Sequence, residues 1–276
     1  GEIVHLRQSH KPQGDGLPSV RQSHKRIVVK IGASIFAADK HKIATALISN
    51  IAGQISDLIK QGREVVLVSS GAIAIGMSIL KITNRPGELA YLQATAAIGQ
   101  HELMHIYKLA LNKHSINCAL LLLTWDDFSD KRYQNAKNTL NTLLKLKCVP
   151  IINENDTVAT EEIKFGDNDK LSALVSILVD ADLLIILSDV DGLLDKNKKI
   201  IRSVAKITSG IKSLACPTSK KACVGGMITK IQAAGIAVDS GILCVIANGK
   251  KKGIISQVAK NPFSCGTIFL PQRGRS

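Results

Sequence analysis

Cys148-Val-Pro-Ile-Ile-Asn153 is a short apolar run that passes abruptly into the polar residues Glu154-Asn-Asp-Thr157. Runs of this length that are rich in β-branched residues or leucine are typical of strands buried on both faces of a sheet. Similar runs occur at residues 27–31, 65–69, 118–124, 183–188 and 243–247. Each of the six runs is predicted to be such a buried strand.

Segments of helical length separate these predicted strands. Apolar residues recur every three or four positions from Ile43 to Ile59, and Gly62 closes that segment. A second segment with the same period runs from Tyr133 to Leu144. Because strands alternate with helices, we predict an α/β fold, namely a three-layer αβα sandwich with a mostly parallel central sheet.

The first 25 residues differ from the remainder of the chain. They are polar and basic, and they contain Arg-Gln-Ser-His-Lys twice, at residues 7–11 and 21–25. They lack the apolar core of a secretory signal, and their two acidic residues count against a transit peptide. We expect residues 1–25 to be a disordered or vector-derived leader and residues 26–276 to form one domain.

Composition narrows the class of protein. No uninterrupted apolar stretch reaches about 18 residues, so no membrane span or membrane partner is expected. Six cysteines without a C-x-x-C pair favour a reducing compartment, and we therefore predict a cytoplasmic protein. The net charge of +14 fits nucleic acid, an anionic surface or a small anionic substrate. Aromatic residues are only 3% of the chain, which disfavours nucleic acid as a partner.

Polar or glycine-rich residues follow most of the predicted strands. In a parallel sheet these positions meet at one edge, where ligands bind. Glycines there allow a phosphate to approach the backbone, and a helix N-terminus adds positive charge. A tight strand-to-helix turn is the plain alternative for any single glycine. Neither the P-loop nor the Rossmann pattern occurs. The segments are 32–34, 69–72, 124–127, 153–156 and 188–192.

Two lysines lie next to these segments. Lys30 belongs to an otherwise apolar strand, where a buried ammonium needs an anionic partner unless the strand end reaches solvent. Lys230 follows Gly225-Gly226-Met227 in the first turns of a helix and, viewed alone, fits an ordinary solvated helix lysine better than a site residue. The densest polar clusters lie at residues 153–157 and 164–170. Helix capping can explain Asp167 or Asn168, but the combined amides and carboxylates suit a zwitterionic amino acid.

Seven motifs in a fixed order resemble the amino acid kinase family. The resemblance extends from about Arg26 to Pro271. The order of residues 153–156 and 166–169 is more typical of the members that phosphorylate glutamate than of those that act on acetylglutamate, aspartate, uridylate or carbamate. The seven motifs occupy residues 29–32, 68–74, 96–100, 150–158, 166–173, 188–193 and 225–230.

The resemblance implies a reaction. It implies that ATP phosphorylates the γ-carboxylate of L-glutamate to L-glutamyl 5-phosphate, the first step of proline biosynthesis. Mg²⁺ would be bound mainly through the nucleotide, without dedicated metal ligands in the protein. No general base is needed, because a carboxylate with an ordinary pKa of about 4.3 is already ionised near neutral pH. The resemblance also implies a homo-oligomer, either a dimer or a tetramer, with feedback inhibition by proline.

The resemblance assigns a role to each site residue. Lys30 and Lys230 would stabilise the transferring phosphoryl group, and Asp169 would hold both lysines. Ser70, Asp156 and Asn168 would bind glutamate. The nucleotide would contact Lys30, Gly32, Ser188, Asp189, Val224, Gly225, Gly226, Met227, Ile228, Thr229 and Lys230.

The sequence departs from the family pattern at three positions of the nucleotide site. A small polar residue is usual at position 224, Ser at 228 and Tyr at 194, whereas this chain has Val224, Ile228 and Leu194. Nucleotide affinity or base preference is therefore expected to differ. Many bacterial relatives continue into a C-terminal PUA domain, and the chain to Ser276 is expected to lack it. The alternatives are a kinase for aspartate or acetylglutamate, and a catalytically silent amino acid or nucleotide sensor.

Overall fold

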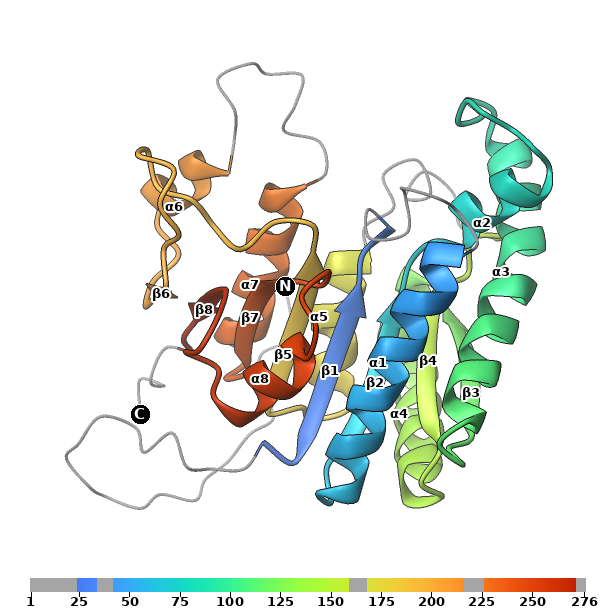
Figure 1. Cartoon of the computed structure of the whole chain (residues 1–276), viewed down its shortest axis with the longest axis horizontal. Coiled ribbons are helices and arrows are strands. Elements are labelled where there is room, and N and C mark those ends of the chain that lie inside the picture. The colour runs from blue at the N-terminus through green and yellow to red at the C-terminus, as the bar shows by residue number, and fades with distance from the viewer. Residues whose placement is uncertain (1–23, 34–41, 159–167, 216–225, 272–276) are drawn as a thin grey trace.

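The computed structural model describes residues 24–33, 42–158, 168–215 and 226–271. Their centre is an eight-stranded sheet with the strand order β3-β4-β2-β1-β5-β7-β8-β6 (Figure 1). Neighbouring strands are parallel except for β7 and β8, which run antiparallel. The strands are β1 (Arg26–Ile31), β2 (Glu64–Ser69), β3 (Cys118–Leu123), β4 (Val149–Glu154), β5 (Leu183–Ser188), β6 (Ser203–Val204), β7 (Leu243–Asn248) and β8 (Thr267–Phe269).

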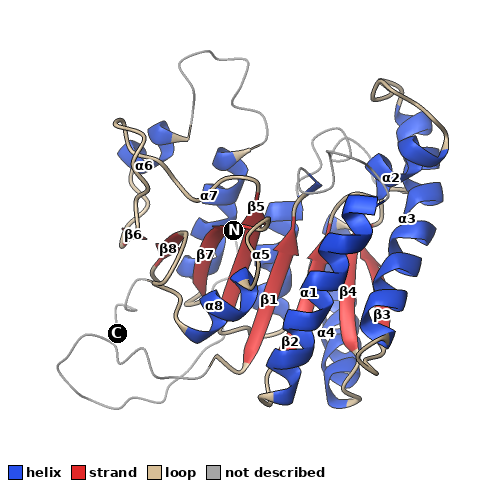
Figure 2. Cartoon of the chain, in the orientation of Figure 1, coloured by secondary structure: helices blue, strands red, loops and turns tan. Residues whose placement is uncertain are grey.

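Helices cover both faces of the sheet (Figure 2). The buried residues of α1, α3 and α8 form one core with one set of strand side chains. Those of α4, α5 and α7 form a second core with the alternate set. The helices are α1 (Lys42–Lys60), α2 (Ala72–Ile79), α3 (Leu89–Asn112), α4 (Asp130–Lys145), α5 (Asn168–Leu178), α6 (Ser209–Leu214), α7 (Met227–Asp239) and α8 (Ile254–Lys260), with a short 3₁₀ helix, η2 (Trp125–Phe128).

The alternation of side chains along β1 directs Lys30 to one of these two layers. Val29 and Ile31 belong to the core under α1 and α3, whereas Val28 belongs to the core under α5 and α7. Because strand side chains alternate with period two, Lys30 shares the face of Val28. The fold thus directs this lysine toward α5 and α7.

The predicted α/β sandwich is confirmed, and the six predicted strands begin and end within one residue of the observed bounds. The expectation that every strand is buried on both faces is wrong for β3. This strand forms one edge of the sheet, and Leu120 at its middle is 39% exposed. Strands β6 and β8 were not predicted, because two or three residues are too few to give a recognisable pattern. The predicted leader lies almost entirely outside the described residues.

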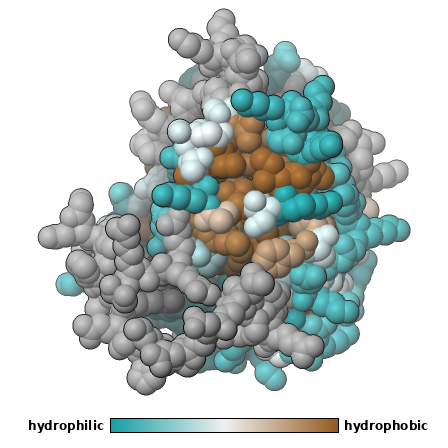
Figure 3. Space-filling model, turned by 90° about the vertical axis from the view of Figure 1, so that its left-hand side faces the viewer, coloured by the Kyte–Doolittle hydropathy of each residue, from teal (hydrophilic) through white to brown (hydrophobic). Residues whose placement is uncertain are grey.

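The opposite edge of the sheet carries the segment from β6 to α6. Its partly buried apolar residues, including Ile207, Ile211 and Leu214, pack against the core under α7. Seen from this side, the molecule presents an apolar area surrounded by hydrophilic residues (Figure 3). Among the described residues, no helix is long and apolar enough to cross a membrane.

Candidate active site

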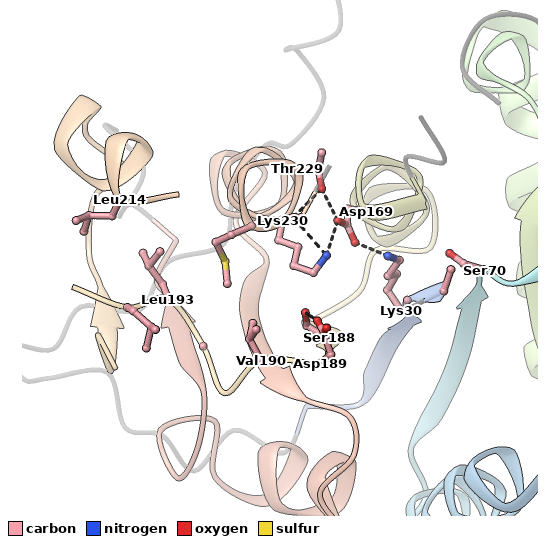
Figure 4. Close-up of a pocket in the computed structure, with 16 residues that line it drawn as sticks. Lys30, Ser70, Asp169, Ser188, Asp189, Val190, Leu193, Leu214, Thr229 and Lys230 are labelled. Carbon is pink, nitrogen blue, oxygen red and sulfur yellow. Dashed lines mark hydrogen bonds and ion pairs between the residues drawn. The ribbon is translucent and has the colours of Figure 1, made fainter. Parts of the chain in front are cut away.

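A carboxylate between two ammonium groups lies at the carboxyl edge of the sheet (Figure 4). Asp169, in the first turn of α5, pairs through Oδ1 with Lys30 Nζ at 2.5 Å and through Oδ2 with Lys230 Nζ at 3.0 Å. Lys30 is 4% exposed and Lys230 8% exposed. The structure therefore excludes a solvated position for either lysine and brings together the three residues predicted to be catalytic.

Both charge and hydrogen bonding hold Asp169 in its ionised form. Burial alone raises the pKa of this carboxyl, but the charges of Lys30 and Lys230 and hydrogen bonds from Lys30 and Thr229 outweigh burial and leave the pKa at about 2. The Thr229 hydroxyl donates to Asp169 Oδ2 at 2.7 Å. The carboxylate stays charged throughout the neutral range and keeps the two lysines in place.

A cavity of about 520 Å³ opens beside these charges. It is lined by Gly32, Ser188, Asp189, Gly226 and Met227, all of which were predicted to contact nucleotide. Val190, Leu193, Leu194 and Leu214 also line it and add an apolar wall. Such a cavity, polar at one end and apolar at the other, has the size and chemistry for a nucleotide.

The structure does not support one predicted nucleotide contact, and two others lie outside the described residues. Met227, Thr229 and Lys230 of α7 line the cavity, but Ile228 does not. Successive helical residues are about 100° apart, so the residue between Met227 and Thr229 points to another side of α7. Val224 and Gly225 fall in the range that the structure does not describe.

A second, smaller cavity of about 100 Å³ adjoins the first. Ser70, Asp156 and Asn168, the residues predicted to bind glutamate, all line it. Ala33 and Ser70 line both cavities, so a ligand in one can meet a ligand in the other at this point. Burial raises the pKa of Asp156 to about 6, although the charge of Arg85 acts to lower it.

Four residues around the second cavity were given no individual role, although Asn153 and Glu154 belong to the polar cluster predicted to suit an amino acid. Arg85, Asn153 and Glu154 line it, and Gln100 of α3 lies behind it. Gln100 and Asn153 belong to quoted family motifs, but position in a motif does not state a partner. Arg85 lies in the α2–α3 connection, where sequence pattern gives no indication of which way a side chain points.

Helices α2 and α3 approach each other closely behind the second cavity, because each helix turns a glycine toward the backbone of the other. A Cβ on Gly99 of α3 would lie 1.8 Å from the carbonyl oxygen of Ala72, and a Cβ on Gly76 of α2 would lie 1.9 Å from that of Thr95. Ala72 and Ile73 of α2 line the cavity, whereas α3 supports it from behind through Gln100. The glycine contact therefore sets the distance between these two supports.

The described residues contain no group of three or more His, Cys, Asp or Glu side chains arranged to hold a metal ion. The buried carboxylate of the site, Asp169, faces two lysines and a threonine hydroxyl. The protein groups of the site thus supply positive charge and hydrogen-bond donors to an anionic ligand, which is the arrangement that phosphoryl transfer requires.

Comparison with known proteins agrees with this arrangement. The profile of the amino acid kinase family matches residues 25–248. Glutamate 5-kinase of Caldanaerobacter subterraneus subsp. tengcongensis is 47% identical over 255 residues, which are 90% of this chain and 68% of the relative. Glutamate 5-kinase of Methanosarcina barkeri is also 47% identical, over 90% of this chain and 69% of the relative.

Solved structures share the fold at much lower identity. Carbamate kinase from Giardia lamblia bound to AMP-PNP superimposes with a TM-score of 0.62 and 18% identity, covering 91% of this chain and 99% of that one. N-acetylglutamate synthase from Neisseria gonorrhoeae, complexed with coenzyme A and L-arginine, gives a TM-score of 0.65 and 16% identity, over 92% of this chain and 63% of that one. These structures show the shared fold, and the family profile and the sequence relatives show that the chain belongs to the amino acid kinase family and, within it, to the glutamate 5-kinases.

Proposed function

We propose that the protein transfers the γ-phosphoryl group of ATP to the γ-carboxylate of L-glutamate and so makes L-glutamyl 5-phosphate for proline biosynthesis. One observation carries the proposal. The Lys30–Asp169–Lys230 cluster lies where a nucleotide-sized cavity meets a smaller polar cavity, and Ser70 lines both. The small cavity takes glutamate, and the large cavity takes ATP.

The main barrier to this reaction is charge. An ionised carboxylate must approach a triphosphate, and both are anions. Lys30 and Lys230 lie in a water-poor site where their attraction for phosphoryl oxygens is stronger than in bulk water. Each lysine keeps a hydrogen bond or ion pair to Asp169, so the pair needs little rearrangement when the phosphoryl group passes between the two cavities.

The nucleotide site combines backbone and side-chain donors. Gly32 follows β1, and Gly226 precedes α7, so phosphates placed there meet backbone N–H groups and the positive N-terminal end of a 13-residue helix. We propose that Mg²⁺ enters with ATP, held mainly by phosphate oxygens and water, and that it further neutralises the charge of the phosphates. Val190, Leu193, Leu194 and Leu214 would contact the base and ribose by apolar packing.

A product-trapping assay tests the reaction and its acceptor. Purified protein is incubated with ATP, Mg²⁺ and hydroxylamine, which converts an acyl phosphate to a hydroxamate. We expect hydroxamate with glutamate and little or none with aspartate or N-acetylglutamate. A folded protein that forms no glutamate-dependent hydroxamate would refute the proposed function, whereas product with another acceptor would assign the chain a different substrate.

We also propose that the protein forms a homo-oligomer and that it works in a reducing cytoplasm. Helix α3 and strand β3 expose Tyr91 (60%), Ile98 (39%), Leu109 (52%) and Leu120 (39%), an unusual number of large apolar side chains on adjacent elements. The four cysteines within the described residues carry free thiols. Light scattering on the wild type and on Ile98→Glu tests association, and a monomeric wild type would refute it.

A further inference from the structure

Asn168 lines the small cavity, and a network of hydrogen bonds fixes which end of its amide faces a ligand. Its Nδ2 donates to the backbone oxygen of Ser69 at 2.8 Å, to Asn153 Oδ1 at 2.7 Å and to Ser70 Oγ at 3.0 Å. The Ser69 carbonyl can only accept, so the nitrogen of Asn168 must point inward. Its carbonyl oxygen therefore points away from these three acceptors, and Asn168 itself lines the small cavity.

The orientation of Asn153 is fixed in the same way. The backbone N–H of Glu154 donates to Asn153 Oδ1 at 2.9 Å, and a backbone N–H can only donate. Asn153 Nδ2 therefore points the other way and donates to Gln100 Oε1 at 2.6 Å. Gln100, from α3, thus ends a chain of amides that runs through Asn153 to Asn168. Asn153 itself is 2% exposed, so its amide is largely shielded from bulk water.

The polarity of this chain decides what the cavity can bind. Asp156, Glu154 and Arg85 line the cavity beside Asn168. The carbonyl oxygen of Asn168 and the ionised carboxylates are acceptors that suit the three donors of an ammonium group, whereas the Arg85 guanidinium suits a carboxylate of the substrate. An amide oxygen turned the other way would place an N–H donor there and repel an ammonium.

We infer that Gln100 is a positioning residue that acts through Asn153 to hold the carbonyl oxygen of Asn168 toward the α-ammonium group of the substrate. The inference rests on the proposed function, since it assigns a partner to one group of glutamate. It also gives a reason for the choice of substrate, because an N-acylated amino acid lacks the charged donor that this acceptor set selects.

Two nearly isosteric variants of Gln100 test the inference. Gln100→Met keeps the length of the side chain but cannot accept from Asn153, whereas Gln100→Glu keeps an acceptor oxygen. Gln100 Nε2 is buried without a hydrogen-bond partner, so its removal in either variant deprives the fold of no hydrogen bond from that atom. Both variants should therefore fold, which thermal unfolding checks.

We expect the KM for glutamate to rise about tenfold in Gln100→Met, since one hydrogen bond in a buried network is lost and Asn153 is left unpaired. The kcat should stay within about threefold of the wild type, and Gln100→Glu should recover a KM close to the wild-type value. The KM for ATP should change in neither variant, because none of the three amides, Gln100, Asn153 and Asn168, lines the large cavity.

Glutarate, which is glutamate without its ammonium group, separates positioning from a general loss of structure. Its inhibition constant against glutamate should be nearly the same in wild type and Gln100→Met. Three outcomes would each overturn the inference. They are equal weakening of glutarate and glutamate binding in Gln100→Met, an unchanged KM for glutamate in that variant, and a KM for glutamate in Gln100→Glu that does not return toward the wild-type value. Should glutarate bind too weakly for an inhibition constant, the KM difference between the two variants decides. A wild type without glutamate turnover refutes instead the proposed function.

Discussion

Each end of β1 carries one basic residue, and the two residues differ in their partners and in their exposure to water. At the beginning of the strand, Arg26 Nε pairs with Glu64 Oε2 of β2 at 2.7 Å, with side chains 21% and 26% exposed. Four residues later, Lys30 pairs with Asp169 at 2.5 Å, with both side chains 5% exposed. Water reaches the first pair and screens its charges, but it hardly reaches the second.

The partners at the two ends explain the difference. Arg26 contacts groups that surround the start of the strand: Glu64, Asn141, the backbone oxygen of Val179 and, through its own N–H, Asp182. These contacts tie neighbouring elements together. Lys30 instead lines a cavity and shares its carboxylate with Lys230 of another element. Charge ties elements together at one end of the sheet, and we propose that it serves catalysis at the other.

The largest expected effect follows from removing the charge that the two lysines share. Asp169→Asn should lower kcat at least about a thousandfold, because the lysines lose the group that positions them. It should also lower the free energy of unfolding by about 3–5 kcal/mol, since two buried ammonium groups lose their counter-charge. Initial rates at saturating substrates and denaturant unfolding measure the two effects. A variant with wild-type turnover would refute the positioning role of Asp169.

A smaller loss is expected when one lysine is removed. Lys230→Ala should lower kcat about a hundredfold and leave the KM for glutamate within about threefold, because the lysine lies between the cavities and not in the glutamate cavity. Lys137→Ala is the matched control, since Lys137 forms an ion pair with Asp180 far less buried than the site. If the two variants have the same turnover, Lys230 does not stabilise the transferring group.

Two of the carboxylates at the site, Asp169 and Asp156, should respond differently to pH. Asp169, with a pKa of about 2, stays ionised from pH 5 to 8, whereas Asp156, with a pKa of about 6, gains a proton in that range. Binding of an ammonium group requires ionised Asp156, so the KM for glutamate should rise about tenfold per pH unit below 6. Asp156→Asn should raise the KM and remove this dependence; a variant that retains it would assign the titration to another group.

The raised pKa of Asp156 also predicts how the stability of the fold depends on pH. The pKa of Asp156 is raised in the fold above its ordinary value of 3.8, so its ionisation opposes folding. This cost is fully present above about pH 6 and disappears as the pH falls below 3.8. Asp156→Asn should therefore unfold at a higher temperature than the wild type at pH 7.5, with the difference vanishing in acid. Thermal unfolding at several pH values checks this.

The smallest effect is expected at the start of β1. Glu64→Gln removes the charge opposite Arg26 and should lower the free energy of unfolding by about 1 kcal/mol or less, because the pair is partly exposed. Its kcat and both KM values should equal those of the wild type. A change in turnover with this variant would contradict the separate roles of the two ends and would mean that they are coupled.

Much of this arrangement could be predicted from sequence because it depends on local pattern. Apolar runs placed the six longer strands, and residues that follow strands had to meet at one edge. Lys30 inside an apolar run needed an anion, and Asp169 supplies it. Helix α7 illustrates the limit, since Lys230 viewed alone fitted a solvated position and its burial depends on α5 beside it.

The remaining features depend on side-chain direction and on distant contacts. Gln100 lies 53 residues from Asn153, and sequence alone does not show that the two amides meet. The contribution of Arg85 depends on the course of a connection without regular structure. Ile228 shows a related limit, because a motif names consecutive residues whereas a helix turns only some of their side chains toward a cavity, and Ile228 does not line it.

The contact between Gly76 and Gly99 has a consequence for anyone who tries to change the acceptor of this enzyme. Neither glycine lines the cavity, yet the Cβ of an alanine at either position would lie less than 2 Å from a backbone oxygen of the other helix. Mutant libraries that vary only the residues lining the cavity do not change the distance between α2 and α3. A larger side chain at either glycine would force α2 and α3 apart, so changes at these two positions are a way to alter the cavity without replacing a residue that lines it.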